Sequence, residues 1–174
     1  MKISIIGYSG SGKSTLAAKL AERYKTDVLH LDSVHWLPGW QERSEEEKNR
    51  LVAAFLDTHE NWVIDGNYTK QWYERRLEES DQIVILDFNR ARCLWRVAKR
   101  YRRFQGSTRP DMGEGCEEKL DWPFVKWVLW DGRTKRARDR MRSIEERFSG
   151  KTVRFRNPRQ VRSFERQNGL REGP

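Results

Sequence analysis

The chain has 174 residues, which suits one domain with a sizeable core and is too short for two ordinary domains. Its 35 lysines and arginines outnumber 26 acidic residues, and the net charge of +9, concentrated in the second half, favours polyanionic partners of any kind. The sequence has no leader-like start, no run near the ~20 apolar residues of a membrane span and too few cysteines for a disulfide framework, so we expect a cytoplasmic protein with no membrane partner.

The first motif lies between an apolar run at residues 3–6, typical of a buried strand, and a helical pattern at residues 16–21. It matches the phosphate-binding P-loop, in which glycines let backbone amides point at a polyphosphate beside a helix N-terminus. Lys13 is expected to reach the β- and γ-phosphates of ATP, and Ser14 to place its hydroxyl on Mg²⁺. The remaining expected ATP contacts are Gly7, Ser9, Gly10, Ser11, Gly12 and Thr15.

The second predicted strand, residues 28–32, ends in Asp32. Ligands gather at the carboxyl ends of parallel strands, so Asp32 falls where chemistry is done. The Pro-Gly pair predicts a loop over residues 33–40, which also contains His35. Trp36 and Trp40 in this loop have two interpretations, sandwiching a phosphoryl acceptor or packing in the core. Eight tryptophans and seven phenylalanines predict an aromatic-rich core.

A capping box at Ser44 predicts a helix whose buried stripe is Leu51, Val52, Phe55 and Leu56. The third strand, residues 62–65, ends in Asp65. A carboxylate there is expected to hold Mg²⁺, directly or through water, beside Ser14. An ordinary Asp-Gly turn is the alternative. A charged helix at residues 70–79 and a fourth strand at 82–87 follow.

The next helix has an apolar face at Leu94, Val97, Tyr101 and Phe104, and the opposite side carries Arg92, Arg96, Arg100 and Arg103. A solvated face is one interpretation. Arginine rather than lysine favours the other, because its planar fork suits phosphate contacts and stacking on a base.

Three glycines punctuate residues 106–116, which predict either a closing lid that brings Arg109 over a phosphoryl group or a plain surface loop. A helix then starts at Asp121, breaks at residues 131–132 and continues as a basic helix to 148. A fifth strand at 152–156 precedes a last helix opened by Asn157 and Pro158, where a turn could cradle adenine.

With these motifs in place, the chain resembles the nucleoside-monophosphate-kinase branch of P-loop proteins, the adenylate-kinase-like enzymes. The matching features are the P-loop, the Asp65-Gly66 pair, and the pre-lid arginines Arg96 and Arg100 with the loop around Arg109. Residues 30–32, 36–40, 109–112 and 115–116 are similar to a bacterial subfamily labelled topology modulation protein, a label that describes a DNA-supercoiling phenotype.

The resemblance implies a three-layer α/β/α domain over residues 1–174, built on a five-stranded parallel sheet. It also implies an acceptor-side segment at about 33–61 and a small helical or loop lid at about 104–122. The chain departs from adenylate kinases where Asn67 and Tyr68 follow Asp-Gly in place of Phe-Pro-Arg. It also lacks the usual basic pair for an acceptor phosphate, and a carboxylate such as Asp32 suits a hydroxyl acceptor that must lose a proton.

The leading hypothesis is an ATP-dependent phosphotransferase that uses Mg²⁺. Its expected catalytic residues are Lys13, Asp32, Arg96, Arg100 and Arg109, and Arg96 and Asn157 are also expected at the nucleotide. Its acceptor is expected at Asp32, His35, Trp36, Trp40, Asn67 and Tyr68. The alternative is a regulatory protein that binds nucleic acid and uses nucleotide as a switch, supported by the basic, aromatic-rich C-terminal third. Acceptor identity and oligomeric state stay open at this point.

Overall fold

A computed structural model of the protein describes residues 1–109, 111–113 and 115–170. A sheet of five parallel strands forms the middle layer, in the spatial order β2-β5-β1-β6-β7. The strands are β1 (Lys2–Gly7), β2 (Asp27–His30), β5 (Trp62–Asp65), β6 (Gln82–Leu86) and β7 (Thr152–Phe155). The predicted α/β class and the five-stranded parallel sheet are confirmed.

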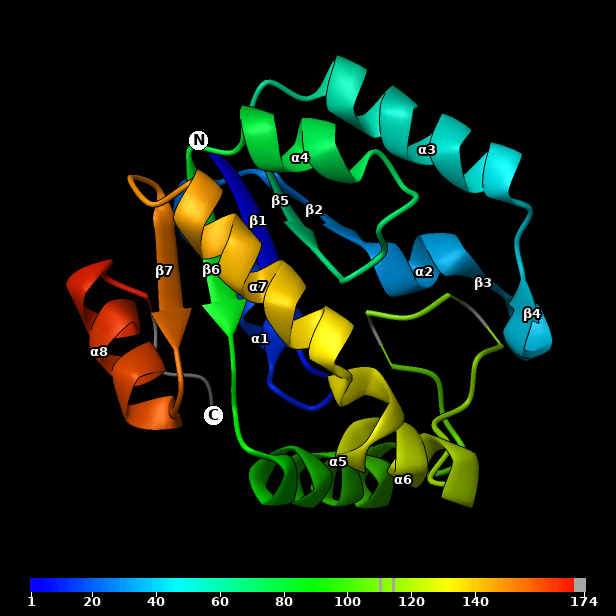
Figure 1. The fold of residues 1–174 in the computed structure, drawn as a ribbon. Coiled ribbons are helices and arrows are strands. Elements are labelled where there is room, and N and C mark those ends of the chain that lie inside the picture. The colour runs from blue at the N-terminus through cyan, green and yellow to red at the C-terminus, as the bar shows by residue number, and fades with distance from the viewer. Residues whose placement is uncertain (110, 114, 171–174) are drawn as a thin grey trace.

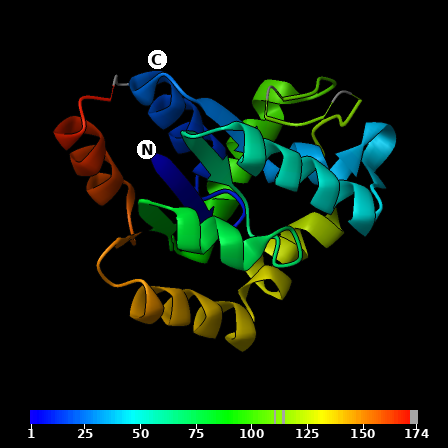
Figure 2. The same cartoon turned by 90° about the horizontal axis from the view of Figure 1, so that it is seen from above.

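Helices cover both faces of this sheet (Figures 1 and 2). On one face, Ile3 and Ile5 of β1 pack against α1 (Lys13–Tyr24) and α8 (Pro158–Gln167). The other face packs against α3 (Glu45–Thr58), α4 (Tyr73–Glu79) and α7 (Lys135–Arg147). Neighbouring residues of a strand point to opposite faces, so the apolar central strands β5, β1 and β6 are buried on both sides, whereas the edge strands β2 and β7 are only partly buried.

Two further helices lie beyond the carboxyl ends of the strands, below the arrowheads of β6 and β7 in Figure 1. They are α5 (Arg90–Phe104) and α6 (Trp122–Leu129), and a short 3-10 turn, η2 (Asp131–Arg133), joins α6 to α7. The predicted break at residues 131–132 is therefore confirmed. Predicted helix starts are confirmed too: Ser44 accepts from the Glu47 N–H, and Asp121 accepts from the Phe124 N–H.

The segment after β2 differs from the sequence prediction. The strand ends at His30, and Asp32 lies in a short helix, α2 (Leu31–His35). Residues 33–40 are not a plain loop, because β3 (Trp36–Leu37) pairs antiparallel with β4 (Gln41–Glu42) across the turn η1 (Pro38–Trp40). Strand β2 ends early because the neighbouring strand β5 ends at Asp65, opposite His30. The Ser33 hydroxyl then donates a hydrogen bond to the His30 carbonyl.

The expected aromatic-rich core is wrong. Trp62 is the single buried tryptophan, whereas five others have between 44% and 68% of their surface exposed: Trp72, Trp95, Trp122, Trp127 and Trp130. The core is built mainly from isoleucine, leucine and valine. In α3, Val52 and Leu56 are buried as predicted, but Leu51 is exposed and Phe55 is half-buried.

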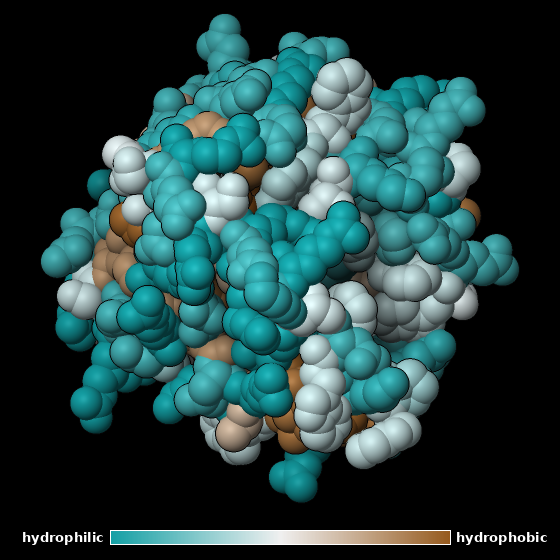
Figure 3. Space-filling view, in the orientation of Figure 1, coloured by the Kyte–Doolittle hydropathy of each residue, from teal (hydrophilic) through white to brown (hydrophobic). Residues whose placement is uncertain are grey.

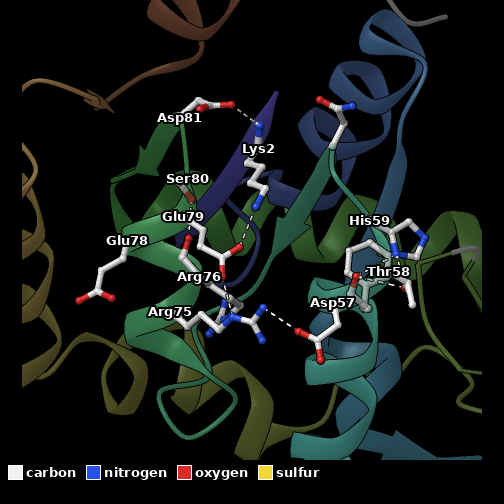
Figure 4. Close-up of polar contacts among 12 residues, drawn as sticks. Lys2, Asp57, Thr58, His59, Arg75, Arg76, Glu78, Glu79, Ser80 and Asp81 are labelled. Carbon is white, nitrogen blue, oxygen red and sulfur yellow. Dashed lines mark hydrogen bonds and ion pairs between the residues drawn. The ribbon is translucent and has the colours of Figure 1, made fainter.

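The amino-terminal edge of the sheet is tied together by a polar network (Figure 4). The Lys2 ammonium contacts Glu79 at 2.8 Å, and the Lys2 N–H donates to Asp81. Arg75 joins Glu79 to Asp57 at the end of α3. This edge lies opposite the carboxyl ends of the strands and serves as scaffold.

The face drawn in Figure 3 is mostly hydrophilic, and its hydrophobic residues show in small separated patches. Among the helices of the described ranges, none combines the length and the apolar character needed to cross a bilayer.

Candidate nucleotide-binding and acceptor site

Strand register brings the sequence motifs to one edge of the sheet. Ile5 of β1 lies opposite Asp65 of β5, and Asp65 lies opposite His30 of β2. The P-loop therefore leaves β1 directly beside the carboxyl end of β5, and the end of β2 lies one strand further along the sheet. A cleft of about 1460 Å³ opens at this edge. It exceeds the roughly 300–1,000 Å³ of an ordinary single-ligand pocket, so it has room for two small molecules.

The P-loop backbone requires glycine at two positions in the cleft wall. Gly10 has φ +77°, and a Cβ there would lie 2.5 Å from the Cys93 carbonyl oxygen of α5. Gly12 has φ +95° and lies directly under the guanidinium of Arg96. Ser9, Gly10, Gly12, Lys13, Ser14 and Thr15 line the cleft, with the N-terminus of α1 at its base.

Ser14 and Asp65 meet in the structure. The Ser14 hydroxyl donates a 2.9 Å hydrogen bond to Asp65 Oδ2. Hydroxyl and carboxylate oxygens are ligands that Mg²⁺ accepts, and the residues therefore fit that ion. No group of three or more His, Cys, Asp or Glu side chains that could hold a metal ion occurs in the described ranges.

Sequence reasoning missed His30, whose Nδ1 lies 2.5 Å from Asp65 Oδ1. Burial alone would lower the pKa of His30, but the hydrogen bond and negative charge of Asp65 outweigh it and raise that pKa. Asp65 is therefore held from both sides, by Ser14 and by His30. Only the β2–β5 register, which the sequence does not display, reveals this pair.

Arginines line the wall above the P-loop. Arg96 and Arg100 project from α5, both half-buried, and burial lowers the pKa of each guanidinium. Arg109 also reaches the cleft and is only 8% exposed. Arg92 and Arg103 are exposed, although Arg103 lies at the rim.

A buried carboxylate, Glu118, also missed from the sequence, joins two of these arginines. Its Oε1 lies 2.7 Å from Arg100 Nη2, and its Oε2 lies 2.5 Å from Arg109 Nε. Asp111 pairs with Arg109 at 2.8 Å. No local motif distinguishes Glu118 from its neighbour Glu117, so only the folded loop identifies it.

The wall on the β2 side is aromatic and carries one carboxylate. The Tyr68 hydroxyl donates a 2.7 Å hydrogen bond to Asp32 Oδ1. The His35 ring stacks on Tyr68 at 4.5 Å and meets Trp36 edge-on at 4.7 Å. Trp40 meets Trp36 at 5.6 Å. All five side chains line the cleft, and neither tryptophan is in the core.

Asn67 has a different position from the one expected of an acceptor ligand. It borders the cleft, but its side-chain amide accepts from the Gly7 N–H at 3.0 Å and donates to the Gly7 carbonyl. It therefore positions the entry to the P-loop. Gly7 and Ser11 lie outside the cleft lining, and the Ser11 hydroxyl is buried without a hydrogen-bond partner in the described ranges.

Asn157, expected at the nucleotide base, is not among the residues that line the cleft. Its side chain accepts from the Gln160 N–H and caps α8, at the end of the edge strand β7. Two strands separate this cap from β5 and Asp65, so the structure does not bring Asn157 to the other site residues.

The glycine-bearing segment at residues 106–116 contacts the acceptor-side segment. Pro110 and Glu114 lie outside the described residues. The Gly39 N–H donates to the Gly115 carbonyl at 3.0 Å, and the Trp40 indole donates to the Glu117 carbonyl at 3.0 Å. The two segments that the sequence separates by some seventy residues therefore form one rim of the cleft.

The fold and the P-loop together define a P-loop kinase-like α/β protein. No family model matches the sequence. The chain is 29% identical over 140 residues to the uncharacterized protein YqaC of Bacillus subtilis strain 168, covering 79% of this chain and 77% of that protein.

Two solved structures share the architecture. TT1252 from Thermus thermophilus has a TM-score of 0.52 and 15% identity, over 96% of this chain and 97% of that one. A Chloroflexus aurantiacus protein described as a "putative kinase" has a TM-score of 0.50 and 13% identity, with 96% and 97% coverage. At these identities the likeness shows the fold.

Proposed function

We propose that the protein is an ATP-dependent phosphotransferase that transfers the γ-phosphoryl group of Mg-ATP to a small-molecule acceptor. The observation that carries this proposal is the 2.9 Å contact between Ser14 and Asp65 at the base of a P-loop-lined cleft. In-line phosphoryl transfer needs positioning and charge neutralisation more than covalent chemistry, and the cleft offers groups for both.

The residues of the donor half of the cleft have roles that follow from their positions around the P-loop. The P-loop amides and Lys13 would hold the phosphates, and Ser14 with Asp65 would hold Mg²⁺, whose positive charge would offset that of the phosphates. Arg96 lies above Gly12, and Arg100 and Arg109 line the same cleft, where they would meet the transferred group. In the free protein, Glu118 balances the charge of the last two arginines.

The acceptor half lies at Asp32, His35, Trp36, Trp40 and Tyr68. We propose one domain over residues 1–174, with the acceptor-side segment at about 33–61 and the lid at about 104–122. The contacts of Gly39 and Trp40 with the opposite segment support a shared rim over the acceptor.

Steady-state ATP consumption against a panel of small acceptors tests the assignment. One acceptor should raise turnover well above the water background, and Lys13→Ala should remove that stimulation while the protein stays folded. Lys2→Ala is the matched lysine control, because Lys2 lies on the same strand edge as Glu79 and Asp81, away from the cleft. Full activity in Lys13→Ala would overturn the assignment.

A second candidate, nucleic-acid binding, is favoured by four exposed tryptophans on and beside α5 and α6. Trp95, Trp122, Trp127 and Trp130 are exposed by 50% to 68%, and the Lys99 ammonium lies 5.6 Å from the Trp95 ring. Aromatic platforms with cations bind single-stranded nucleic acid. Quenching of tryptophan fluorescence by an oligonucleotide at physiological salt would favour nucleic-acid binding as a function. Binding that vanishes at physiological salt would show only non-specific attraction between charges.

A further inference from the structure

The two walls of the cleft carry different chemistry. The donor wall holds Lys13, Arg96 and Arg100, whereas the acceptor wall holds Asp32 and the rings of His35, Trp36, Trp40 and Tyr68. Arg109 lies in the segment that shares a rim with the acceptor side, and it is already paired with Asp111 and Glu118. This asymmetry bears on the acceptor, because a substrate that already carried a phosphate would need cations on the acceptor wall as well.

The cations near the acceptor wall are already engaged. Lys48 is 1% exposed and pairs with Glu42 at 2.8 Å and with Glu45 at 2.5 Å. Arg43 pairs with Glu47 and donates to the Val34 carbonyl. Arg76 is buried and donates to the backbone carbonyls of Gln71 and Tyr68.

Lys70 and Lys119 are exposed cations on this side of the cleft. Lys70 faces the negative charges of Glu42 and Glu45, and the Lys119 ammonium lies 5.3 Å from the centroid of the Trp40 ring. His35 adds no positive charge near neutral pH, since burial and the neighbouring Lys48 ammonium lower its pKa. The acceptor wall therefore offers a phosphate no buried cation that is free to pair with it, within the described residues.

What this wall does offer is a group of aromatic rings and one carboxylate. Trp36, Trp40, His35 and Tyr68 contact one another in a chain of ring pairs at 4.5 to 5.6 Å. Such rings stack on planar ligands. Asp32 Oδ1 accepts from Tyr68, and no described residue makes a hydrogen bond or ion pair with Oδ2.

We propose that the acceptor is a nucleoside, an uncharged molecule with an aromatic base and a free hydroxyl, rather than a nucleoside monophosphate. This inference rests on the proposed phosphotransferase function. The base lies against the Trp36 and Trp40 wall, and the reacting hydroxyl approaches Asp32. Tyr68 is a positioning residue that fixes the Asp32 carboxylate.

The reaction balances with ATP as the donor. The nucleoside hydroxyl oxygen forms a bond to the γ-phosphorus while the bond from that phosphorus to the β–γ bridging oxygen breaks. The hydroxyl proton passes to Asp32, and the products are a nucleoside monophosphate and ADP. General-base catalysis of this kind contributes about 10² to 10⁴ in rate.

The test compares each common nucleoside with its own 5′-monophosphate, with glucose as a non-aromatic alcohol, and identifies the product by chromatography. One nucleoside should be phosphorylated with kcat/KM at least about tenfold above its monophosphate. A monophosphate preferred over its nucleoside, activity only on glucose, or ATP binding with no nucleoside accepted would each overturn the proposal. Failure of Mg-ATP to bind, measured by calorimetry on the same sample, would instead remove the phosphotransferase assignment beneath it.

Two variants with matched controls assign the roles. Asp32→Asn should lower kcat by about 10²-fold or more while nucleoside binding, followed by calorimetry with ADP present, stays within about threefold. Asp27→Asn, at the exposed start of β2, is its control. Trp36→Ala should weaken nucleoside binding about tenfold and leave Mg-ATP binding intact, whereas Trp122→Ala, outside the cleft lining, should change neither. Unchanged nucleoside binding in Trp36→Ala would contradict the aromatic base site.

Discussion

The side-chain amide of Asn67 makes two hydrogen bonds to the backbone of Gly7, accepting from its N–H and donating to its carbonyl. This pair ties the loop after β5 to the last residue of β1. The P-loop therefore starts from a fixed point that is braced by the strand carrying Asp65. The position of Asp65 and the position of the phosphate loop are thus coupled through two neighbouring strands.

Replacing Asn67 with Ala should destabilise the protein by about 1–3 kcal/mol, because the buried N–H and carbonyl of Gly7 lose their partners. Mg-ATP binding should weaken as the P-loop loses its brace. Urea unfolding and calorimetric titration measure the two effects. An Asn67→Ala protein with unchanged stability and unchanged nucleotide affinity would show that the pair positions nothing.

The His30–Asp65 pair predicts a pH-dependent contribution to stability. The pKa of His30 is raised above its ordinary 6.5 by Asp65 against the effect of burial, so the stabilisation is full below pH 6.5 and is lost as pH rises through the raised pKa. His30→Gln should therefore cost about 1–3 kcal/mol in the acidic range and less above the folded-state pKa. Urea unfolding of both proteins across this range measures the difference, and a loss independent of pH would contradict a charged pair.

Glu118 balances Arg100 and Arg109 in the free protein, so its carboxylate competes with bound phosphate for the same guanidinium groups. Glu118→Gln should lower the melting temperature of the free protein, because Arg100 loses its counter-charge and Arg109 keeps only Asp111. Mg-ATP should then raise the melting temperature of the variant more than that of the wild type. Glu117→Gln, its exposed neighbour, is the control, and an equal ATP-induced shift in all three proteins would argue against competition.

The P-loop needs glycine at position 10 because the backbone there is left-handed and packs closely against α5. Gly10→Ala places a methyl group 2.5 Å from the Cys93 carbonyl at φ +77°, which should cost several kcal/mol or distort the loop. Nucleotide binding should fall with it. Gly150→Ala is the matched control, because its added methyl would meet no atom within 4 Å. Thermal unfolding with and without Mg-ATP compares the pair, and equal tolerance of both substitutions would be the contrary result.

The sequence predicted what local periodicity and short motifs encode. The five strands, the P-loop between β1 and α1, and the caps at Ser44 and Asp121 are all in place. Parallel strands buried on both faces form continuous apolar runs, which are hard to miss. The end of β2 was predicted wrongly because a strand stops where its neighbour stops, and that is a property of pairing rather than of the residues at 28–32.

Side-chain partners were the least predictable part of the site. His30 and Glu118 reach Asp65 and Arg109 through contacts that depend on strand order and loop path, and no spacing rule displays them. The prediction of an aromatic-rich core was wrong for a related reason. A tryptophan on α5 or α6 satisfies the same helical pattern whether its face meets the core or solvent.

The central claim is that this cleft binds Mg-ATP through the P-loop and the Ser14–Asp65 pair. Calorimetric titration of ATP into the wild type, Lys13→Ala and Asp65→Asn, each with Mg²⁺ and with a chelator, tests it most directly. We expect the wild type to bind one ATP per chain, with an affinity that falls when Mg²⁺ is removed. Lys13→Ala should bind ATP much more weakly, and the affinity of Asp65→Asn for ATP should depend little on Mg²⁺. A folded wild-type protein that binds no ATP, or binds it equally well in all three forms with or without Mg²⁺, would contradict the claim.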